Sequence, residues 1–166
     1  MRIGIALGSN LGDRLANLRT ARARIADLAT DKSVLASKVY ETEPVNCEPG
    51  AGKFLNAVIE IEYDGDPTAL LDKLITIEES LGRDRDHARN VSRKIDLDML
   101  YAGDLIINNE RLQLPHPRVP GRKFVLQPLA DIRPDLILPK QTKAVSELLA
   151  QSPDSAKVTC FTEDWS

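Results

Sequence analysis

The sequence predicts an α+β fold in which two helices pack on one antiparallel sheet. Three observations predict it: segments with a period of two that are typical of strands, segments with apolar residues every three or four positions that are typical of helices, and their order along the chain. Over residues 2–101 that order is strand, helix, strand, strand, helix, strand, which is the split βαβ pattern of ferredoxin-like sheets. A length of 166 residues suits a substantial core, so we expect residues 1–166 to form one domain.

The first half of this core comprises a strand, a helix and a second strand. Residues 2–8 alternate and end on a glycine, which indicates a strand. Residues 9–13 form a tight, glycine-containing turn before a helix with one buried stripe, made of Leu15, Leu18, Ala21, Ile25 and Leu28. A second strand is expected at residues 33–42. The proline- and glycine-rich loop at residues 43–52 is longer than a hairpin requires, and such loops usually carry function.

The second half of the core begins with the clearest strand, at residues 54–63. Its apolar face holds Leu55, Ala57, Ile59 and Ile61, and its other face holds Phe54, Asn56 and Val58. Asp66 is a good N-cap and Pro67 a good first residue for the helix that follows, which Gly82 ends. The fourth core strand then runs to Tyr101.

Beyond the core we expect an added hairpin and short C-terminal helices. Residues 105–107 form the added hairpin strand, and three prolines make residues 115–124 irregular. Residues 125–132 and 144–150 are expected to be short helices, and residues 157–162 a late edge strand.

Two aspartates in the fourth core strand are the best candidates for chemistry. Asp96 and Asp98 alternate with apolar residues, so both lie on one face of the strand, about 7 Å apart along the backbone. Paired carboxylates suit Mg²⁺, which prefers one or two of them together with substrate phosphates. A solvated polar strand edge is the alternative reading of an Asp-x-Asp pattern alone. The arginines upstream, namely Arg83, Arg85, Arg89 and Arg93, favour a metal–nucleotide site, because guanidinium groups hold phosphates.

Composition and charge exclude several function classes. The net charge of −3 does not favour binding to nucleic acid or to anionic membranes, whereas the cations concentrated in the middle third suit a small polyanion. Cys47 and Cys160 are far apart and lack CxxC spacing, which argues against a disulfide framework or a zinc site. We see neither a signal-peptide pattern nor a membrane-spanning apolar run, and we therefore expect a cytoplasmic protein.

Five short motifs occur in a characteristic order along the chain. They are Ala6–Gly12, Tyr40–Val45, Phe54–Ala57, Gly82-Arg83 with Arg93–Asp98, and Leu114–Pro117 with Gly121–Phe124. Together they resemble the 6-hydroxymethyl-7,8-dihydropterin pyrophosphokinase family of folate synthesis. The chain departs from many members at Asn90-Val91-Ser92, where a Trp-Gly-Pro or similar run is common.

The resemblance implies a ferredoxin-like monomer that transfers the β,γ-pyrophosphoryl group of ATP to the pterin hydroxymethyl group and releases AMP. Two Mg²⁺ ions on Asp96 and Asp98 are implied, with ATP as co-substrate. The implied catalytic residues are Arg83, Arg93, Asp96 and Asp98. The implied ATP-binding residues are Glu78, Arg85, Arg93, Met99, Arg111, His116 and Arg122. The implied pterin-binding residues are Thr42, Pro44, Val45, Phe54, Asn56, Asp96 and Phe124.

Two other functions stay open at this point. An Asp-x-Asp strand in a similar sheet can direct attack at the α-phosphorus, which would make the protein a nucleotidyltransferase that releases pyrophosphate. A ferredoxin-like ligand-sensing module with a structural acid pair is the non-enzymatic alternative. The pterin motifs favour the pyrophosphokinase.

Overall fold

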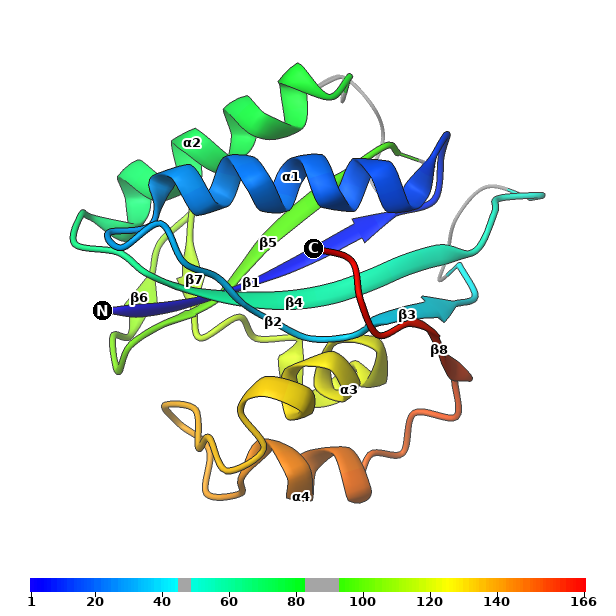
Figure 1. Ribbon diagram of the computed structural model, residues 1–166. Coiled ribbons are helices and arrows are strands. Elements are labelled where there is room, and N and C mark those ends of the chain that lie inside the picture. The colour runs from blue at the N-terminus through cyan, green and yellow to red at the C-terminus, as the bar shows by residue number, and fades with distance from the viewer. Residues whose placement is uncertain (45–48, 83–92) are drawn as a thin grey trace.

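The computed structural model describes residues 1–44, 49–82 and 93–166, and one antiparallel sheet runs through them (Figure 1). Its strands follow the order β5-β1-β4-β3-β8, and the short β2 also pairs with β4. Every pairing is antiparallel, as the sequence predicts. The strands are β1 (Arg2–Ser9), β2 (Leu35–Ala36), β3 (Val39–Thr42), β4 (Phe54–Glu62), β5 (Asp96–Ala102) and β8 (Val158–Thr162).

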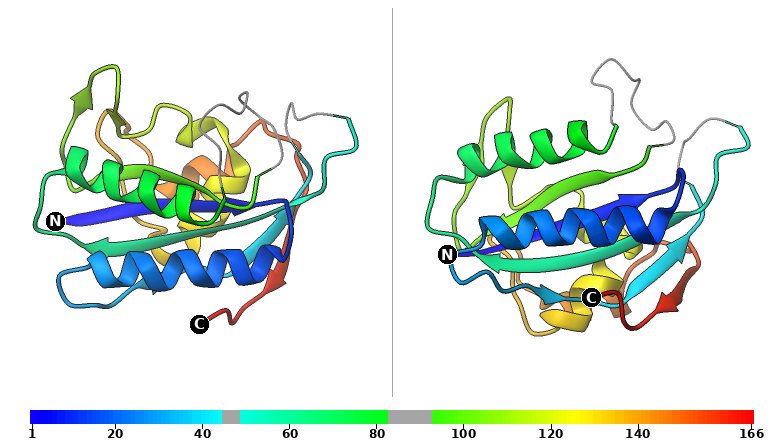
Figure 2. Two further views of the ribbon diagram at one scale, coloured as in Figure 1. Left: turned by 90° about the horizontal axis from the view of Figure 1, so that it is seen from above. Right: turned by 45° about the horizontal axis from the view of Figure 1, so that its top comes forward.

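A helical layer covers each face of the sheet (Figures 1 and 2). The helices α1 (Arg14–Leu28) and α2 (Pro67–Ser80) lie side by side on what we call the first face. The second face carries the 3-10 helix η1 (Val119–Gly121) with α3 (Lys123–Ile132) and α4 (Val145–Ala150). Within the described ranges, no helix is both long enough and apolar enough to cross a membrane.

The interior strand β1, which lies between β5 and β4, separates two hydrophobic cores. Ile3, Ile5 and Leu7 are buried in the core under α1 and α2. Gly4, Ala6 and Gly8 alternate with them and face the second side, where the core under α3 and α4 is smaller. The sequence predicted two helices packed on the sheet, and α1 and α2 take that place. On the second face, α3 and α4 cover one part, and a cavity opens in the remaining part.

The helix boundaries follow the predicted capping residues. The Asp66 carboxylate accepts a hydrogen bond from the Thr68 amide at 3.1 Å, and Pro67 is the first residue of α2. Gly82 has a φ of +99°, the left-handed conformation that commonly follows a helix end. At α1, for which no capping residue was predicted, the Asp13 carboxylate accepts a hydrogen bond from the Ala16 amide at 3.1 Å.

The predicted strand at residues 33–42 is interrupted at Ser37, where the serine hydroxyl takes the place of a backbone carbonyl as the acceptor for an amide of β4. Ser37 donates its amide to the Val58 carbonyl at 2.9 Å, and its hydroxyl accepts from the Val58 amide at 2.9 Å. The Trp165 indole then donates to the Ser37 carbonyl at 2.7 Å. The segment therefore forms β2 and β3 with a break between them.

The added hairpin is present but shifted from its predicted position. It pairs β6 (Ile107–Asn108) with β7 (Gln113–Leu114), whereas the prediction placed a strand at residues 105–107. Leu105 and Ile106 are exposed, so no buried face extends the strand toward them.

A bulge in β5 explains why the first strand needs a glycine at position 4. The register passes from Ile5 opposite Met99 to Gly4 opposite Tyr101, which leaves Leu100 as an extra residue. Leu100 and Tyr101 consequently both pack in the core of the second face. A Cβ atom on Gly4 would lie 2.3 Å from Cε1 of Tyr101, so a larger residue cannot fit under the ring.

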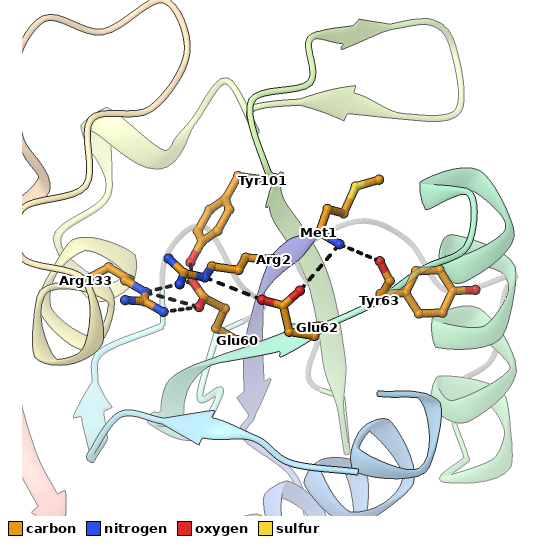
Figure 3. Close-up of polar contacts among 7 residues, drawn as sticks. All are labelled: Met1, Arg2, Glu60, Glu62, Tyr63, Tyr101 and Arg133. Atoms are coloured by element: carbon orange, nitrogen blue, oxygen red, sulfur yellow. Dashed lines mark hydrogen bonds and ion pairs between the residues drawn. The ribbon is translucent and has the colours of Figure 1, made fainter. Parts of the chain in front are cut away.

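A buried acidic group joins the two strands that flank β1 (Figure 3). Glu60 of β4 is 5% exposed and accepts a hydrogen bond from the Tyr101 hydroxyl at 2.5 Å. Arg133, just after α3, donates to the same carboxylate through Nη2 at 2.6 Å and through Nε at 3.1 Å. Burial alone raises the pKa of Glu60, but the bonds from Arg133 and Tyr101 outweigh it, so this pKa lies below its usual value.

We expect Glu60→Gln to lower the free energy of unfolding by about 1–2 kcal/mol at pH 7, because the hydrogen bonds lose their charged acceptor. A depressed folded pKa contributes stability above the unfolded pKa, and this contribution is lost as the pH falls through the folded pKa. The difference between wild type and variant should therefore shrink as the pH falls below about 4.3, the usual Glu pKa. Urea unfolding at pH 7, 4 and 3 measures it.

Glu62→Gln is the matched control, since it makes the same change on the same strand. The Glu62 side chain is 47% exposed, and its ion pairs with the amino terminus and Arg2 are both 3.5 Å long. We expect a change within about 0.5 kcal/mol at every pH. A Glu60→Gln effect that stayed constant from pH 7 to pH 3 would contradict the assigned charge state.

Candidate active site

A cavity of about 380 Å³ opens on the second face, where β1 ends and β4 and β5 begin. Strands, loops and the start of α3 all contribute to its wall. The lining residues are Ala6, Leu7, Gly8, Thr42, Glu43, Phe54, Asn56, Ala57, Arg93, Asp96, Asp98, Leu100, His116, Arg118, Val119, Arg122, Phe124 and Val125.

Small residues of β1 form the floor of this cavity. Gly8 pairs with Asn56 of β4 on one side and with Asp96 of β5 on the other. A Cβ atom on Gly8 would lie 3.1 Å from Oδ1 of Asn56, which is closer than an ordinary contact. Ala6 pairs with Asp98 in the same way. The floor therefore leaves space between a carboxylate side and an amide side.

The carboxylate side of the cavity is formed by β5 and the residues just before it. Asp96 and Asp98 are half-buried and both line the cavity, as the period of two predicts. The Arg93 Nη1 atom lies 3.2 Å from Oδ1 of Asp96, and this arginine side chain is 13% exposed. The paired charges hold the guanidinium beside the carboxylate.

This carboxylate pair suits Mg²⁺, which substrate oxygens can help to bind, better than it suits a metal ion that needs a full set of protein ligands. Among the described residues, no cluster of three or more His, Cys, Asp or Glu side chains could enclose a metal ion. Asp96 and Asp98 stand side by side at an open cavity, which leaves room for substrate oxygens on the ion. Mg²⁺ commonly binds through one or two carboxylates plus phosphates and water.

Glu78 is placed behind β5 and does not line the cavity. It is 6% exposed on α2, and its Oε2 atom accepts the Leu97 amide at 2.9 Å. Leu97 stands between Asp96 and Asp98, and β5 is an edge strand among the described strands, paired with β1 alone. Glu78 therefore fixes the backbone from which both aspartates extend.

The amide side of the cavity comes from β3, β4 and the start of α3. Asn56 is 8% exposed, and its Nδ2 atom donates to Oγ1 of Thr42 at 2.6 Å. Phe54 and Phe124 are half-buried and also line this side. The guanidinium carbon of Arg122 lies 5.5 Å from the centroid of the Phe124 ring. Two flat rings near a fixed amide can hold a planar polar heterocycle.

The loop before η1 brings His116 to the cavity in a defined orientation. The His116 amide donates to the Leu100 carbonyl at 2.8 Å, which ties the loop to β5. The Arg118 amide donates to Nδ1 of His116 at 3.2 Å. Because Nδ1 accepts, the neutral imidazole carries its proton on Nε2 and can donate it to an anionic group.

The structure thus brings most of the implied site residues to one cavity. Those that line it are Thr42, Phe54, Asn56, Arg93, Asp96, Asp98, His116, Arg122 and Phe124. Four others do not line it. Glu78 is behind β5, Met99 is 3% exposed in the core of the first face, Arg111 forms an ion pair with Asp72, and Pro44 is half-buried nearby in the chain. Val45, Arg83 and Arg85 lie outside the described residues, as does the departure at residues 90–92.

Asn10 is a site-organising residue that the sequence analysis treated as part of a tight turn. Its amide donates to the Arg93 carbonyl at 3.1 Å, and its Oδ1 atom accepts the Arg93 amide at 2.8 Å. Its Nδ2 atom donates to the Gly52 carbonyl at 3.2 Å. At 6% exposure, Asn10 joins the segments that lead into β4 and β5. Turns are rich in Asn, so nothing in the sequence distinguishes this role.

A family model described as 7,8-dihydro-6-hydroxymethylpterin-pyrophosphokinase (HPPK) matches residues 4–134, the range that contains the whole lining given above. The 2-amino-4-hydroxy-6-hydroxymethyldihydropteridine pyrophosphokinase of Haemophilus influenzae is 39% identical over 150 residues, which cover 90% of this chain and 92% of the relative. Its namesake from Bacillus subtilis is 44% identical over 128 residues, covering 77% and 75%. That of Pseudomonas aeruginosa is 37% identical over 152 residues, covering 92% of each chain.

Solved structures with the same fold come from longer chains. The wild-type HPPK-DHPS of Plasmodium falciparum, crystallised with pterin and p-hydroxybenzoate, matches with a TM-score of 0.70 at 16% identity. A triple mutant of that protein matches with a TM-score of 0.73 at 15% identity. In both cases the match covers 90% of this chain and 41% of the solved one. At such identities the likeness shows the fold alone.

We expect Asn10→Asp to lower the free energy of unfolding by about 1–3 kcal/mol and to weaken ligand binding in the cavity. The new carboxylate can still accept the Arg93 amide, but it cannot donate to the Gly52 carbonyl and repels that oxygen instead. Urea unfolding measures the loss of stability.

Asn109→Asp is the matched control for this change. Asn109 is exposed, and its Oδ1 atom accepts from the amides of Arg111 and Leu112, two bonds that an aspartate keeps. It should unfold like the wild type. Equal stability of Asn10→Asp and Asn109→Asp would rule out the role of Asn10 in joining the segments that lead into β4 and β5.

Proposed function

The chain belongs to the 7,8-dihydro-6-hydroxymethylpterin-pyrophosphokinase family, as its motifs predicted, and on that premise we propose the reaction that it catalyses. Membership makes it an ATP-dependent diphosphotransferase, and it supports pyrophosphate transfer in folate biosynthesis. We propose that the β,γ-pyrophosphoryl group of ATP passes to the hydroxymethyl oxygen of 6-hydroxymethyl-7,8-dihydropterin, and that AMP leaves. The observation that carries this proposal is the meeting of a carboxylate side and an amide side above Gly8.

In this proposal the pterin occupies the amide side of the cavity. The ring stacks between Phe54 and Phe124, and Asn56 pairs with the donor and acceptor groups at its edge. The bond to Thr42 holds the Asn56 amide in one orientation, which favours one arrangement of those groups. Asp96 faces the hydroxymethyl group from across Gly8. Pro44 and Val45 join this pocket by resemblance to the family.

ATP occupies the carboxylate side. Arg93 and His116 contact phosphate oxygens, and Arg122 lies at the border with the pterin. The resemblance adds Arg83 and Arg85 to this group. It also adds Arg111 and the backbone around Met99, with Glu78 supporting the strand from behind. Arginine suits this task because its planar group makes two parallel bonds to phosphate oxygens.

Catalysis then depends mainly on alignment and on charge neutralisation. The hydroxymethyl oxygen forms a bond to the β-phosphorus while the bond from that phosphorus to the oxygen of the α-phosphate breaks, and the hydroxyl proton is released to water. Asp96 and Asp98 would hold two Mg²⁺ ions, which when bound neutralise the triphosphate and make the attacking hydroxyl more acidic. Arg93 stabilises negative charge that grows beside Asp96, and Arg83 shares this role by resemblance.

We also propose the finer features of the fold and of the protein's setting. The strands β5-β1-β4-β3 with α1 and α2 are read as a ferredoxin-like split βαβ core. Residues 1–166 act as one domain and as a monomer in the cytoplasm. The partners are small molecules, with no nucleic acid and no membrane.

The direct experiment is to mix the protein with Mg²⁺, ATP and 6-hydroxymethyl-7,8-dihydropterin and to identify both products. We expect AMP to appear in step with the pterin pyrophosphate. Release of pyrophosphate together with a nucleotidylated pterin would show attack at the α-phosphorus and identify a nucleotidyltransferase. Tight ligand binding without Mg²⁺ and without ATP turnover would support the ligand-sensing alternative.

We expect Asp96→Asn and Asp98→Asn each to lower kcat by about 10³-fold or more, because the metal site loses a charged ligand. Both residues are partly exposed at an open cavity, so melting temperatures should stay near the wild-type value. Initial rates of AMP formation measure the effect.

Asp104→Asn is the matched control, since Asp104 is exposed in the turn after β5 and does not line the cavity. It should keep wild-type rates. Near-normal activity of Asp96→Asn or Asp98→Asn would remove that carboxylate from the metal site.

A further inference from the structure

Arg118 lines the cavity, although neither the motifs nor the period of the sequence pointed to it. Its side chain is exposed at the cavity wall, and its guanidinium forms no ion pair or hydrogen bond within the part of the chain that the structure describes. The other two lining arginines have partners: Arg93 pairs with Asp96, and Arg122 lies over the Phe124 ring. Arg118 is therefore a positive charge at the cavity with its donors available.

The backbone of Arg118 is fixed, although its side chain has no partner among the described residues. Its amide donates to Nδ1 of His116 at 3.2 Å, and its carbonyl accepts the Gly121 amide at 3.2 Å. The next residue, Val119, is 1% exposed in the core of the second face. A fixed base limits the region that the guanidinium can reach, and this lowers the entropy lost when it binds a ligand.

The position of this loop assigns Arg118 to the carboxylate side of the cavity. The His116 amide is bonded to the Leu100 carbonyl at 2.8 Å, two residues beyond Asp98 on β5. The amide side, with Thr42 and Asn56, lies across β1 on β3 and β4. A flat heterocycle on that side has no need of a second cation near β5, whereas a polyphosphate on the carboxylate side does.

We propose that Arg118 binds a phosphate group of ATP, next to the group held by His116. This inference rests on the proposed function, which assigns ATP to the carboxylate side. It adds a second arginine to the contact from Arg111 that the family resemblance implies for ATP. In the structure Arg111 pairs with Asp72 of α2, and it does not line the cavity.

The test is calorimetric binding of α,β-methylene-ATP with Mg²⁺, which reads nucleotide affinity without turnover. We expect Arg118→Gln to weaken binding about tenfold, the loss of one charged hydrogen-bonded contact. The affinity of Arg118→Lys should lie between those of the wild type and Arg118→Gln, because lysine keeps the charge but not the paired donors. The salt dependence of binding should also be smaller for Arg118→Gln. Binding of the pterin to the analogue-saturated protein should not change.

Arg19→Gln is the control for removing an exposed arginine, since Arg19 lies on α1 against the opposite face. It should bind the analogue like the wild type. Wild-type affinity and salt dependence of Arg118→Gln would overturn the proposal. A wild type that binds the analogue but forms no AMP would refute the proposed reaction while leaving the Arg118 comparison intact.

Discussion

The site depends on one constraint, which is that the interior strand β1 must carry large side chains on one face and almost none on the other. Ile3, Ile5 and Leu7 fill the core under α1 and α2. On the opposite face Gly4 admits the Tyr101 ring, and Gly8 leaves the floor of the cavity open. Because β1 lies between β4 and β5, any large side chain on that face would displace a neighbour or occupy the ligand space.

Buried polar groups hold β4 and β5 on either side of β1, whose second face carries the small residues Gly4, Ala6 and Gly8, called the bare strip below. At one end, Glu60 of β4 bonds to Tyr101 of β5 and to Arg133, so β4 and β5 are linked across β1 (Figure 3). Gly4 lies between Glu60 and Tyr101 in the pairing register. At the cavity end, Asn10 joins the segments that enter β4 and β5. The placement of the candidate site residues therefore depends on buried contacts at both ends of β1, one distant from the cavity and one beside it. Partly satisfied groups at either end would cost stability, since buried polar atoms need partners.

Sequence reasoning succeeded where the signal is local to one element. The period of two was enough to place Asn56 opposite the apolar face of β4 and to place Asp96 and Asp98 together opposite the apolar face of β5, because alternation is a property of any strand. It failed where a role depends on which distant segments meet. Glu78 follows the buried stripe of α2 by one position, and its bond to Leu97 arises only once α2 packs against the edge of β5. The role of Asn10 likewise depends on Arg93, more than eighty residues away. The position of Arg118 depends on the path of the irregular loop that contains it.

The same bare strip also decides where the proposed reaction would take place. A phosphorus held from the β5 side and a hydroxymethyl group held from the β4 side must come within bonding distance of each other. Gly8 stands between Asp96 and Asn56 in the pairing register, and a Cβ atom there would already be 3.1 Å from the Asn56 amide oxygen. The space above Gly8 is therefore where the two substrates would meet. Gly8 would in this sense be part of the proposed chemistry, although it contributes no functional group.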